Sequence, residues 1–316
     1  MTINKQSLLY SFWAFIRHPK YEPAALKKSI LSKSWDIFRL TGFFLMLSVI
    51  IGYLSSLILQ SFNYDLTKNE ILNLFAQKNI LLVIFLALIW APISEELSFR
   101  LILKYSPFRF SFSVGFLLVL FYQIILSLFP AVTAALPPWL ADPTVWQALA
   151  HYVLFVGASG FGFGYLLKKS TDSKFIEKLY SKNFPWLFYA LTTFFAFLHF
   201  FNYTDIKQIW FLAPIIVLPQ FILSLNLGFI RVNYGLRWSI LTHFGHNFMS
   251  AFPSIILMAA SANIFEFVIT KDEQLLSRLS LGDMVIMALS SLMMIAFGLV
   301  AIIASLFLLL DLCKKK

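Results

Sequence analysis

The sequence of 316 residues is poor in cysteine and in charge. Cys313 is the single cysteine, so an intrachain disulfide is excluded, and it belongs to no metal-binding or redox pattern. Charged residues make up 13% of the chain and hydrophobic residues 59%, which excludes an ordinary soluble domain. Acidic residues number 15 against 25 lysines and arginines. The net charge of +10 would suit a protein that binds nucleic acid, but membrane topology explains it better, and no nucleic-acid partner is expected.

Long apolar runs take the place of the missing charge. A run of about 18 or more apolar residues predicts a membrane-spanning helix. Eight stretches qualify: 40–60, 79–103, 112–129, 146–167, 185–203, 209–230, 237–262 and 283–312. We therefore expect an all-α, polytopic membrane helical bundle with about eight transmembrane helices. Residues 1–39, where aromatic and basic side chains interleave, are expected to lie at the membrane interface, and residues 40–316 form the integral membrane domain.

The basic residues are distributed unevenly over the two ends of these spans. With the N-terminus in the cytoplasm, the inside segments hold 19 lysines and arginines and the outside loops hold 5. Arg100 alone lies within a span. The positive-inside rule expects this asymmetry, so we predict that both termini are cytoplasmic.

Glycines recur in the stretch GASGFGFGYLL. A nucleotide-binding glycine loop would follow a strand, and none is expected before this stretch. Gly160 and Gly164 instead lie on one helix face, and this spacing is typical of close packing between membrane helices.

Few polar ionisable residues lie inside the expected spans, and such residues are functional candidates. Those that matter here, with two polar neighbours, are Glu95, Glu96, Arg100, His199, Asn202, His243, His246 and Asn247.

The stretch APISEELSFR places two glutamates and an arginine among apolar residues. Glu96 and Arg100 are four residues apart and share a helix face, so an ion pair is expected. Glu95 points about 100° away and has no local counter-charge, which makes it a candidate general base. Pro92 lacks an amide hydrogen and leaves the carbonyl of Leu88 without its helical partner. A kink beside a hydrated cavity is the expected result, because lipid does not solvate a free carbonyl.

Two further stretches carry imidazoles. Phe195 and His199 share a helix face, as do His243 and Asn247, while His246 is rotated by about 60° from His243. A hydrogen bond between helices is the plain alternative for each histidine alone. At about 1.5 Å per residue, Glu95 lies roughly 12 Å and His243 roughly 9 Å from the cytoplasmic end of its span, whereas His199 lies roughly 18–21 Å in. His199 therefore needs helix tilt or a deeper start of its span to meet the other two.

Together the three stretches resemble a known family. EELSFR matches Glu-Glu-x-x-x-Arg, FAFLH matches Phe-x-x-x-His, and HFGHN matches His-x-x-x-Asn. In this order on membrane helices they resemble the CAAX-protease and bacteriocin-processing (CPBP) family of intramembrane endopeptidases, which includes the type II CAAX prenyl endopeptidase and the bacterial Abi proteins. The resemblance covers about residues 79–262 and implies a multi-pass protein of a bacterial inner (plasma) membrane that acts on a hydrophobic or lipidated peptide near the cytoplasmic side.

The resemblance also implies roles for individual residues. Glu95 would activate a water molecule with help from His199. His243 and Asn247 would stabilise the oxyanion, and Glu96 and Arg100 would support the site. One departure from the family pattern is the separation of Arg100 and His199 by 99 residues, because an additional helix pair at about 112–167 lies between the first two motifs.

Three alternatives remain open at this point. A non-catalytic immunity or scaffold protein would keep the polar cluster for structure, and a transporter or proton relay would use the same buried groups. A zinc-dependent protease would place the metal on Glu95, His199 and His243, with His246 nearby. The stretch HFGH is not the His-Glu-x-x-His helix of zinc proteases, so a mechanism without a metal or other cofactor is favoured.

Overall fold

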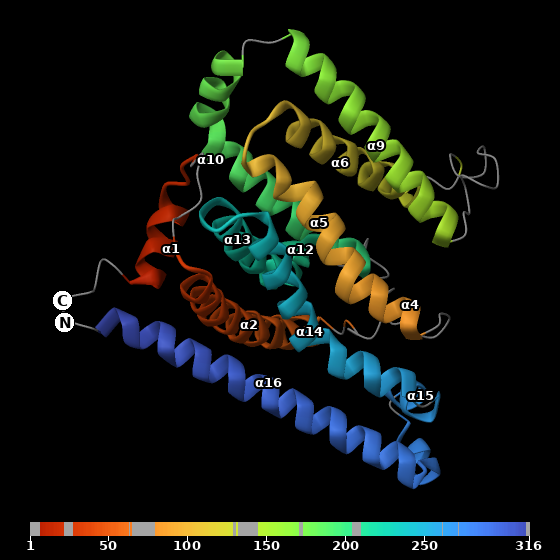
Figure 1. Ribbon diagram of the computed structural model, residues 1–316. Coiled ribbons are helices and arrows are strands. Elements are labelled where there is room, and N and C mark those ends of the chain that lie inside the picture. The colour runs from red at the N-terminus through yellow and green to blue at the C-terminus, as the bar shows by residue number, and fades with distance from the viewer. Residues whose placement is uncertain are drawn as a thin grey trace.

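A computed structural model shows how the chain folds (Figure 1). It describes residues 7–21, 28–62, 64, 80–128, 131, 145–170, 173–203, 210–260, 262–270 and 272–313. Within these ranges the structure is helical and holds no strand. The all-α class expected from the sequence is confirmed for this part of the chain.

The described residues form a series of helices. In chain order they are α1 (Leu8–Arg17), α2 (Ile30–Ser61), α4 (Ile80–Ile84), the π-helix η1 (Phe85–Trp90), α5 (Ala91–Phe99), the 3-10 turn η2 (Leu101–Leu103), α6 (Pro107–Leu128), α9 (Val145–Ser170), α10 (Ser173–Leu198), the 3-10 turns η3 (His199–Asn202) and η4 (Trp210–Leu212), α12 (Ala213–Ile216), α13 (Leu218–Asn233), α14 (Leu236–Ala260), α15 (Ala262–Thr270), the 3-10 turn η5 (Glu273–Arg278) and α16 (Leu281–Cys313).

The described residues of the eight apolar stretches lie mainly in helices, but fewer than eight of these helices have the length and composition of a span. Five helices among the described residues are long and apolar enough to cross a membrane, and their bounds are Ile30–Ser61, Leu81–Leu103, Pro107–Leu126, Phe175–Asn202 and Leu281–Cys313. A sixth candidate is the bent pair Trp210–Ile216 and Leu218–Asn233, whose halves meet at 45°. The chain is therefore a multi-helix protein with several membrane-compatible helices.

The helices form two flanks around a central group (Figure 1). Helices α2 and α16 run side by side on one flank, and α6 and α9 pair on the other. Between them, α13 contacts α2, α10 and α14, and α5 contacts α6 and α14. The inserted helix pair thus covers the motif helix α5 from the outside of the bundle.

The packing of α6 against α9 depends on glycine. A Cβ atom on Gly160 would lie 2.4 Å from the ring of Phe112, and one on Gly164 would lie 2.7 Å from the ring of Phe108. Real Cβ atoms do not approach other atoms so closely. The two aromatic rings therefore fit only because glycine has no side chain at these positions. The close helix packing expected for the Gly160 and Gly164 face is confirmed.

The N-terminal segment is packed on the bundle. Ser29 caps α2, which begins at Ile30, ten residues before the apolar stretch that marked it in the sequence. The buried face of α1 inserts Phe12 between Phe44 of α2 and Phe229 of α13, at ring-centroid distances of 4.7 and 5.4 Å. The opposite face of α1 exposes Trp13 and other residues. Where α1 lies relative to a membrane surface stays a prediction.

One end of the bundle collects basic residues and both ends of the described chain, and we call it the basic end. Arg39 of α2 pairs there with Asp311 of α16, and the hydroxyl of Tyr234, just after α13, donates to Asp36 at 2.9 Å. The largest buried apolar cluster lies at this end, and among its members are Phe12, Leu40, Phe99, Ile102, Leu103, Phe184, Phe188, Phe229, Ile230 and Leu308. Four of the five basic residues predicted to lie in outside loops are not among the described residues: Lys68, Lys78, Lys207 and Lys271.

Candidate active site

The glutamates follow an irregular turn in the helix that carries them. Residues 85–90 form a π-helix, in which the N–H of Ala91 donates to the carbonyl of Leu86, five residues back. In this register the carbonyl that faces the missing amide hydrogen of Pro92 belongs to Ala87. The sequence pointed to the carbonyl of Leu88, which was wrong by one residue, because that expectation assumed an α-helical register.

Asn247 of α14 compensates for the missing backbone hydrogen bond. Its Nδ2 donates to the carbonyl of Ala87 at 3.1 Å, across 160 residues of sequence. A freed carbonyl in an apolar environment costs free energy, so a side-chain amide at this point stabilises the π-turn. Asn247 is thereby fixed against the helix of the glutamates and keeps a second N–H.

Glu96 and Arg100 form the ion pair expected from their spacing. Nε of Arg100 lies 3.6 Å from Oε1 of Glu96, and both side chains are almost completely buried. Ser239 donates a short hydrogen bond to Glu96, and Nη2 of Arg100 donates to Ser224 at 2.8 Å. The guanidinium also lies 4.0 Å from the ring centroid of Phe195, so a motif residue of α10 is tied to the motif of α5.

Glu95 has a different environment from its neighbour. Its side chain keeps 25% of its surface exposed, whereas that of Glu96 keeps none. Oε2 of Glu95 has no hydrogen-bond partner among the described residues and lies 3.6 Å from Nε2 of His243. A carboxylate that faces a cavity with a spare oxygen is available to a water molecule.

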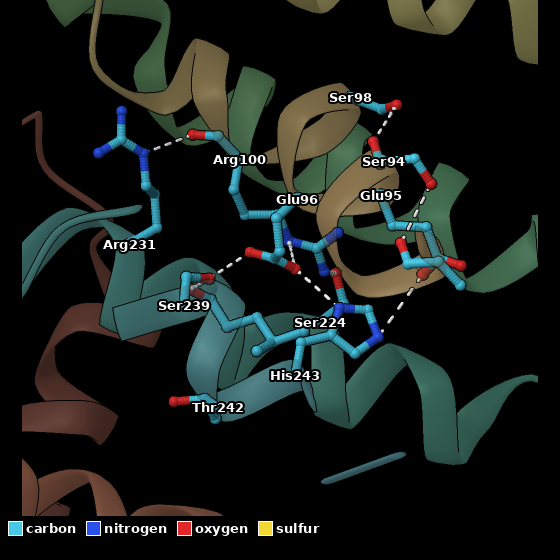
Figure 2. A network of polar contacts seen from close by, with 12 residues as sticks. Ser94, Glu95, Glu96, Ser98, Arg100, Ser224, Arg231, Ser239, Thr242 and His243 are labelled. Atoms are coloured by element: carbon cyan, nitrogen blue, oxygen red, sulfur yellow. Dashed lines mark hydrogen bonds and ion pairs between the residues drawn. The ribbon is translucent and has the colours of Figure 1, made fainter. Parts of the chain in front are cut away.

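His243 lies between the two glutamates (Figure 2). Its Nδ1 lies 3.1 Å from Oε1 of Glu96, and because a carboxylate only accepts, Nδ1 carries the hydrogen of this bond. Nε2 is thereby directed at Glu95. A buried carboxylate that sets the tautomer of an imidazole is the arrangement that orients a histidine for proton transfer.

His199 begins the 3-10 turn that ends α10. Its Nδ1 lies 2.9 Å from the carbonyl of Phe195, one turn earlier, so Nδ1 is again the donor and Nε2 is left for the cavity. The ring of Phe195 lies between the two motif imidazoles, with its centroid 4.8 Å from that of His199 and 6.0 Å from that of His243. The difference in membrane depth predicted between His199 and the other two residues does not keep them apart, because all three line one cavity. The helix begins at Ser173 and runs through Pro185, so the deeper start of the span near that proline is not seen.

A cavity of about 670 Å³ brings the candidate residues together. Its wall includes Glu95, His199, His243, His246 and Asn247, together with apolar side chains of α6, α10 and α13. Glu96 and Arg100 lie behind the wall. Four wall atoms are buried without a hydrogen-bond partner among the described residues: Oγ of Ser48, Oε2 of Glu95, Oε1 of Gln220 and Nδ1 of His246. Such atoms need water or a ligand, so the cavity is suited to a polar reaction inside an apolar bundle.

Sequence reasoning missed three residues that hold the site. Ser224 and Ser239 bind the two members of the ion pair, and both are buried. Arg231 donates to the carbonyls of Arg100 and Leu101, at 2.7 and 3.1 Å, and so caps the end of α5. Serines inside apolar helices are common, so only the contacts of Ser224 and Ser239 identify them. Arg231 could have been found, because an arginine beside an apolar run is unusual.

A zinc ion would need Glu95, His199 and His243 as its ligands. Among the residues that the structure describes, no three His, Cys, Asp or Glu side chains are grouped closely enough to hold a metal ion together. His243 offers only Nε2, because Nδ1 is bound to Glu96, and His199 likewise offers only Nε2.

Comparison with known proteins gave no relative for this chain: no protein-family model matches it, and neither a curated protein nor a solved structure does.

Proposed function

We propose that this protein is an intramembrane endopeptidase that hydrolyses a peptide bond in a hydrophobic or lipidated peptide. The observation that supports this most directly is the joint placement of Glu95, two motif imidazoles and Asn247 on the wall of one cavity with unpartnered polar atoms. The resemblance of the three motifs to the CPBP family points to the same activity. The proposed topology has eight spans with both termini in the cytoplasm of a bacterium.

The proposed reaction uses water as the nucleophile. Glu95, assisted by His199, takes a proton from a water molecule, whose oxygen forms a bond to the carbonyl carbon of the substrate. Negative charge develops on the carbonyl oxygen, which accepts a hydrogen bond from the second N–H of Asn247. His243 adds a second hydrogen bond through Nε2 when its ring is doubly protonated, because its Nδ1–H is already bound to Glu96. The carbon–nitrogen bond then breaks, and the proton on Glu95 goes to the leaving amine. Glu96 keeps His243 in the orientation that this step needs.

The decisive variant is Glu95→Gln. Glutamine keeps the shape of the side chain but cannot take a proton, so we expect cleavage to fall by about 10²–10⁴-fold, the contribution typical of a general base. The measurement is cleavage of a panel of hydrophobic peptides by the purified protein in lipid nanodiscs, with mass-spectrometric detection of both fragments. Ser291→Ala, a change at an exposed serine of α16 that does not line the cavity, serves as the control and should retain activity.

Two arms of the assay test the alternatives. A chelator that removes activity, restored by zinc, would support the metal-dependent form on Glu95, His199 and His243. One observation fits the scaffold alternative as well: Glu96, Arg100 and Ser239 bind one another and would stabilise the bundle without any reaction. Cleavage that is absent in the wild type, or unchanged in a well-folded Glu95→Gln variant, would reject the peptidase.

A further inference from the structure

The cavity is closed towards the basic end. Behind the wall, Glu96, Arg100, Ser224 and Ser239 each expose 2% of their surface or less. Beyond them the largest apolar cluster fills the bundle, and the buried residues Phe99 and Phe195 belong to both the cavity wall and the cluster. Arg231 binds two carbonyls at the end of α5 and covers the same region. A substrate therefore has no route to Glu95 through this end.

The wall extends in the opposite direction on every helix that contributes to it. On α14 the wall begins at His243 and ends at Ala251, which is about 12 Å further from the start of that helix. On α13 it comprises Pro219, Gln220 and Leu223, all in the first half of a helix that ends at the basic end. On α10 it continues past the last helical turn to Tyr203.

The far part of the wall is also the more exposed part. Ser250 and Phe201 are exposed, and the residues around them are partly exposed, in contrast to the buried group behind Glu96. The polar side chains there are uncharged, with Asn202, Gln220 and Ser250 offering donors and acceptors for a peptide backbone. Among the residues that the structure describes, Glu95 is the only acidic or basic side chain on the wall apart from the histidines. This surface fits a neutral, apolar peptide segment.

We propose that the cavity opens on the side of the membrane opposite to the basic end, and that its substrate is a neutral, apolar peptide segment presented from that side. The substrate assignment rests on the proposed peptidase function, whereas the direction of opening does not. Because basic loops mark the cytoplasmic side, the substrate would come from the non-cytoplasmic face. This replaces the cytoplasmic-side cleavage that the family resemblance implied.

The single native cysteine makes the direction of opening measurable. Cys313 is exposed at the basic end, so the wild-type chain reports on that side of the membrane. On a Cys313→Ser background, Ser250→Cys and Ser48→Cys place one thiol at the exposed part and one in the buried part of the cavity wall. Each change replaces one oxygen by sulfur, so the risk to folding is small.

The test is labelling of sealed vesicles of both orientations with a membrane-impermeant sulfonated maleimide. We expect both introduced thiols to react only in the orientation in which native Cys313 does not. Reaction from the same side as Cys313 would overturn the proposal. Reaction from neither side, with full labelling after denaturation in detergent, would overturn it as well.

Labelling and cleavage separate the two proposals. The labelling pattern needs no turnover, so it should be the same when Glu95→Gln is added. Opposite-side labelling without any peptide cleavage would reject the peptidase and leave the direction of opening intact. Where cleavage is found, modification of Ser250→Cys from the opposite side should abolish it, and modification of Cys313 should leave it unchanged.

Discussion

At the scale of single residues, the two adjacent glutamates have separate tasks. Glu96 is buried and accepts hydrogen bonds from Ser239 and His243 beside the arginine, whereas Glu95 faces the cavity. An isolated buried carboxylate would be costly, and its partners offset that cost. The pair therefore separates a buried, hydrogen-bonded charge from one that faces the cavity, and substitutions at the two positions should have different consequences.

Glu96→Gln should mainly reduce stability. Removal of one partner from a buried ion pair leaves Arg100 uncompensated, so we expect the free energy of unfolding to fall by about 3–5 kcal/mol. Denaturant titration in detergent micelles measures this quantity. Glu95→Gln is the matched control, since this side chain is partly exposed, and its cost should stay below about 1 kcal/mol. Equal costs for the two variants would contradict the division of tasks.

At the scale of elements, the π-turn connects two of the three motifs. It leaves the carbonyl of Ala87 facing Pro92, and the amide of Asn247 binds that carbonyl. Asn247, which the family pattern predicts to stabilise an oxyanion, therefore also holds α14 against η1. Loss of activity in an Asn247 variant would therefore not by itself identify a role in the reaction.

A double-mutant cycle isolates the structural part of this role. Asn247→Ala leaves a buried carbonyl unsatisfied and should cost about 1–3 kcal/mol in the free energy of unfolding. Pro92→Ala restores a backbone N–H that can bind this region, so the cost of Asn247→Ala should shrink by about 0.5–3 kcal/mol in that background. Strict additivity of the two changes would show that Asn247 and Pro92 are not coupled.

The inserted helix pair offers a second test at this scale. Gly160→Ala would bring a Cβ atom to 2.4 Å from Phe112, and overpacking of this kind costs about 1–3 kcal/mol in the free energy of unfolding. Gly157→Ala on the same helix meets no atom within 4 Å and should be neutral or slightly stabilising. Thermal unfolding of the purified variants compares the two, and a destabilised Gly157→Ala would show that helix packing is not the reason.

At the scale of the whole molecule, one arginine joins the first long helix to the last. Arg39 lies 2.7 Å from Asp36 on its own helix and pairs with Asp311 across 272 residues of sequence. Tyr234 and Lys28 add to the same group through Asp36. The start of α2 and the end of α16 are thereby held together at the basic end.

Asp311→Asn should loosen this connection. A hydrogen bond to a charged group contributes about 1.5–3 kcal/mol, and we expect the free energy of unfolding to fall by that amount. Limited proteolysis should then release the end of α16 earlier than in the wild type. Lys28→Met is the control, because this side chain is 38% exposed and a surface ion pair contributes less than about 1 kcal/mol. A larger effect at Lys28 would contradict the role of Asp311.

The all-helical class and the positions of the long apolar helices could be predicted from the sequence, because lipid requires long apolar helices and their residues dominate the composition. The number of spans and the side on which the termini lie stay predictions. The ion pair of Glu96 and Arg100 was equally accessible, since it depends on spacing within one helix. Contacts between helices were not. The partner of the freed carbonyl, the two serines behind the glutamates and the docking of α1 through Phe12 depend on how distant segments pack.

The register of the π-turn marks a second limit. Pro92 signals an irregular helix, but the sequence does not say whether the chain keeps α-helical hydrogen bonds before it or adds a residue to the turn. That single choice moves the free carbonyl from Leu88 to Ala87. The bend of 45° at Val217 was also only partly predictable. Pro219 favours the start of a new helix, but the angle between the two halves depends on how α13 packs against α2 and α14.

If the protein is the proposed peptidase, the closed end behind Glu96 also limits how its peptide substrate can move. A chain cannot thread through the bundle from one face to the other, so the same opening must admit the intact peptide and release both fragments. A segment that continues on both sides of the cleaved bond would have to double back beside Glu95. Successive cuts along one chain are excluded without release, and a slowly departing fragment would act as a competitive inhibitor of the next turnover.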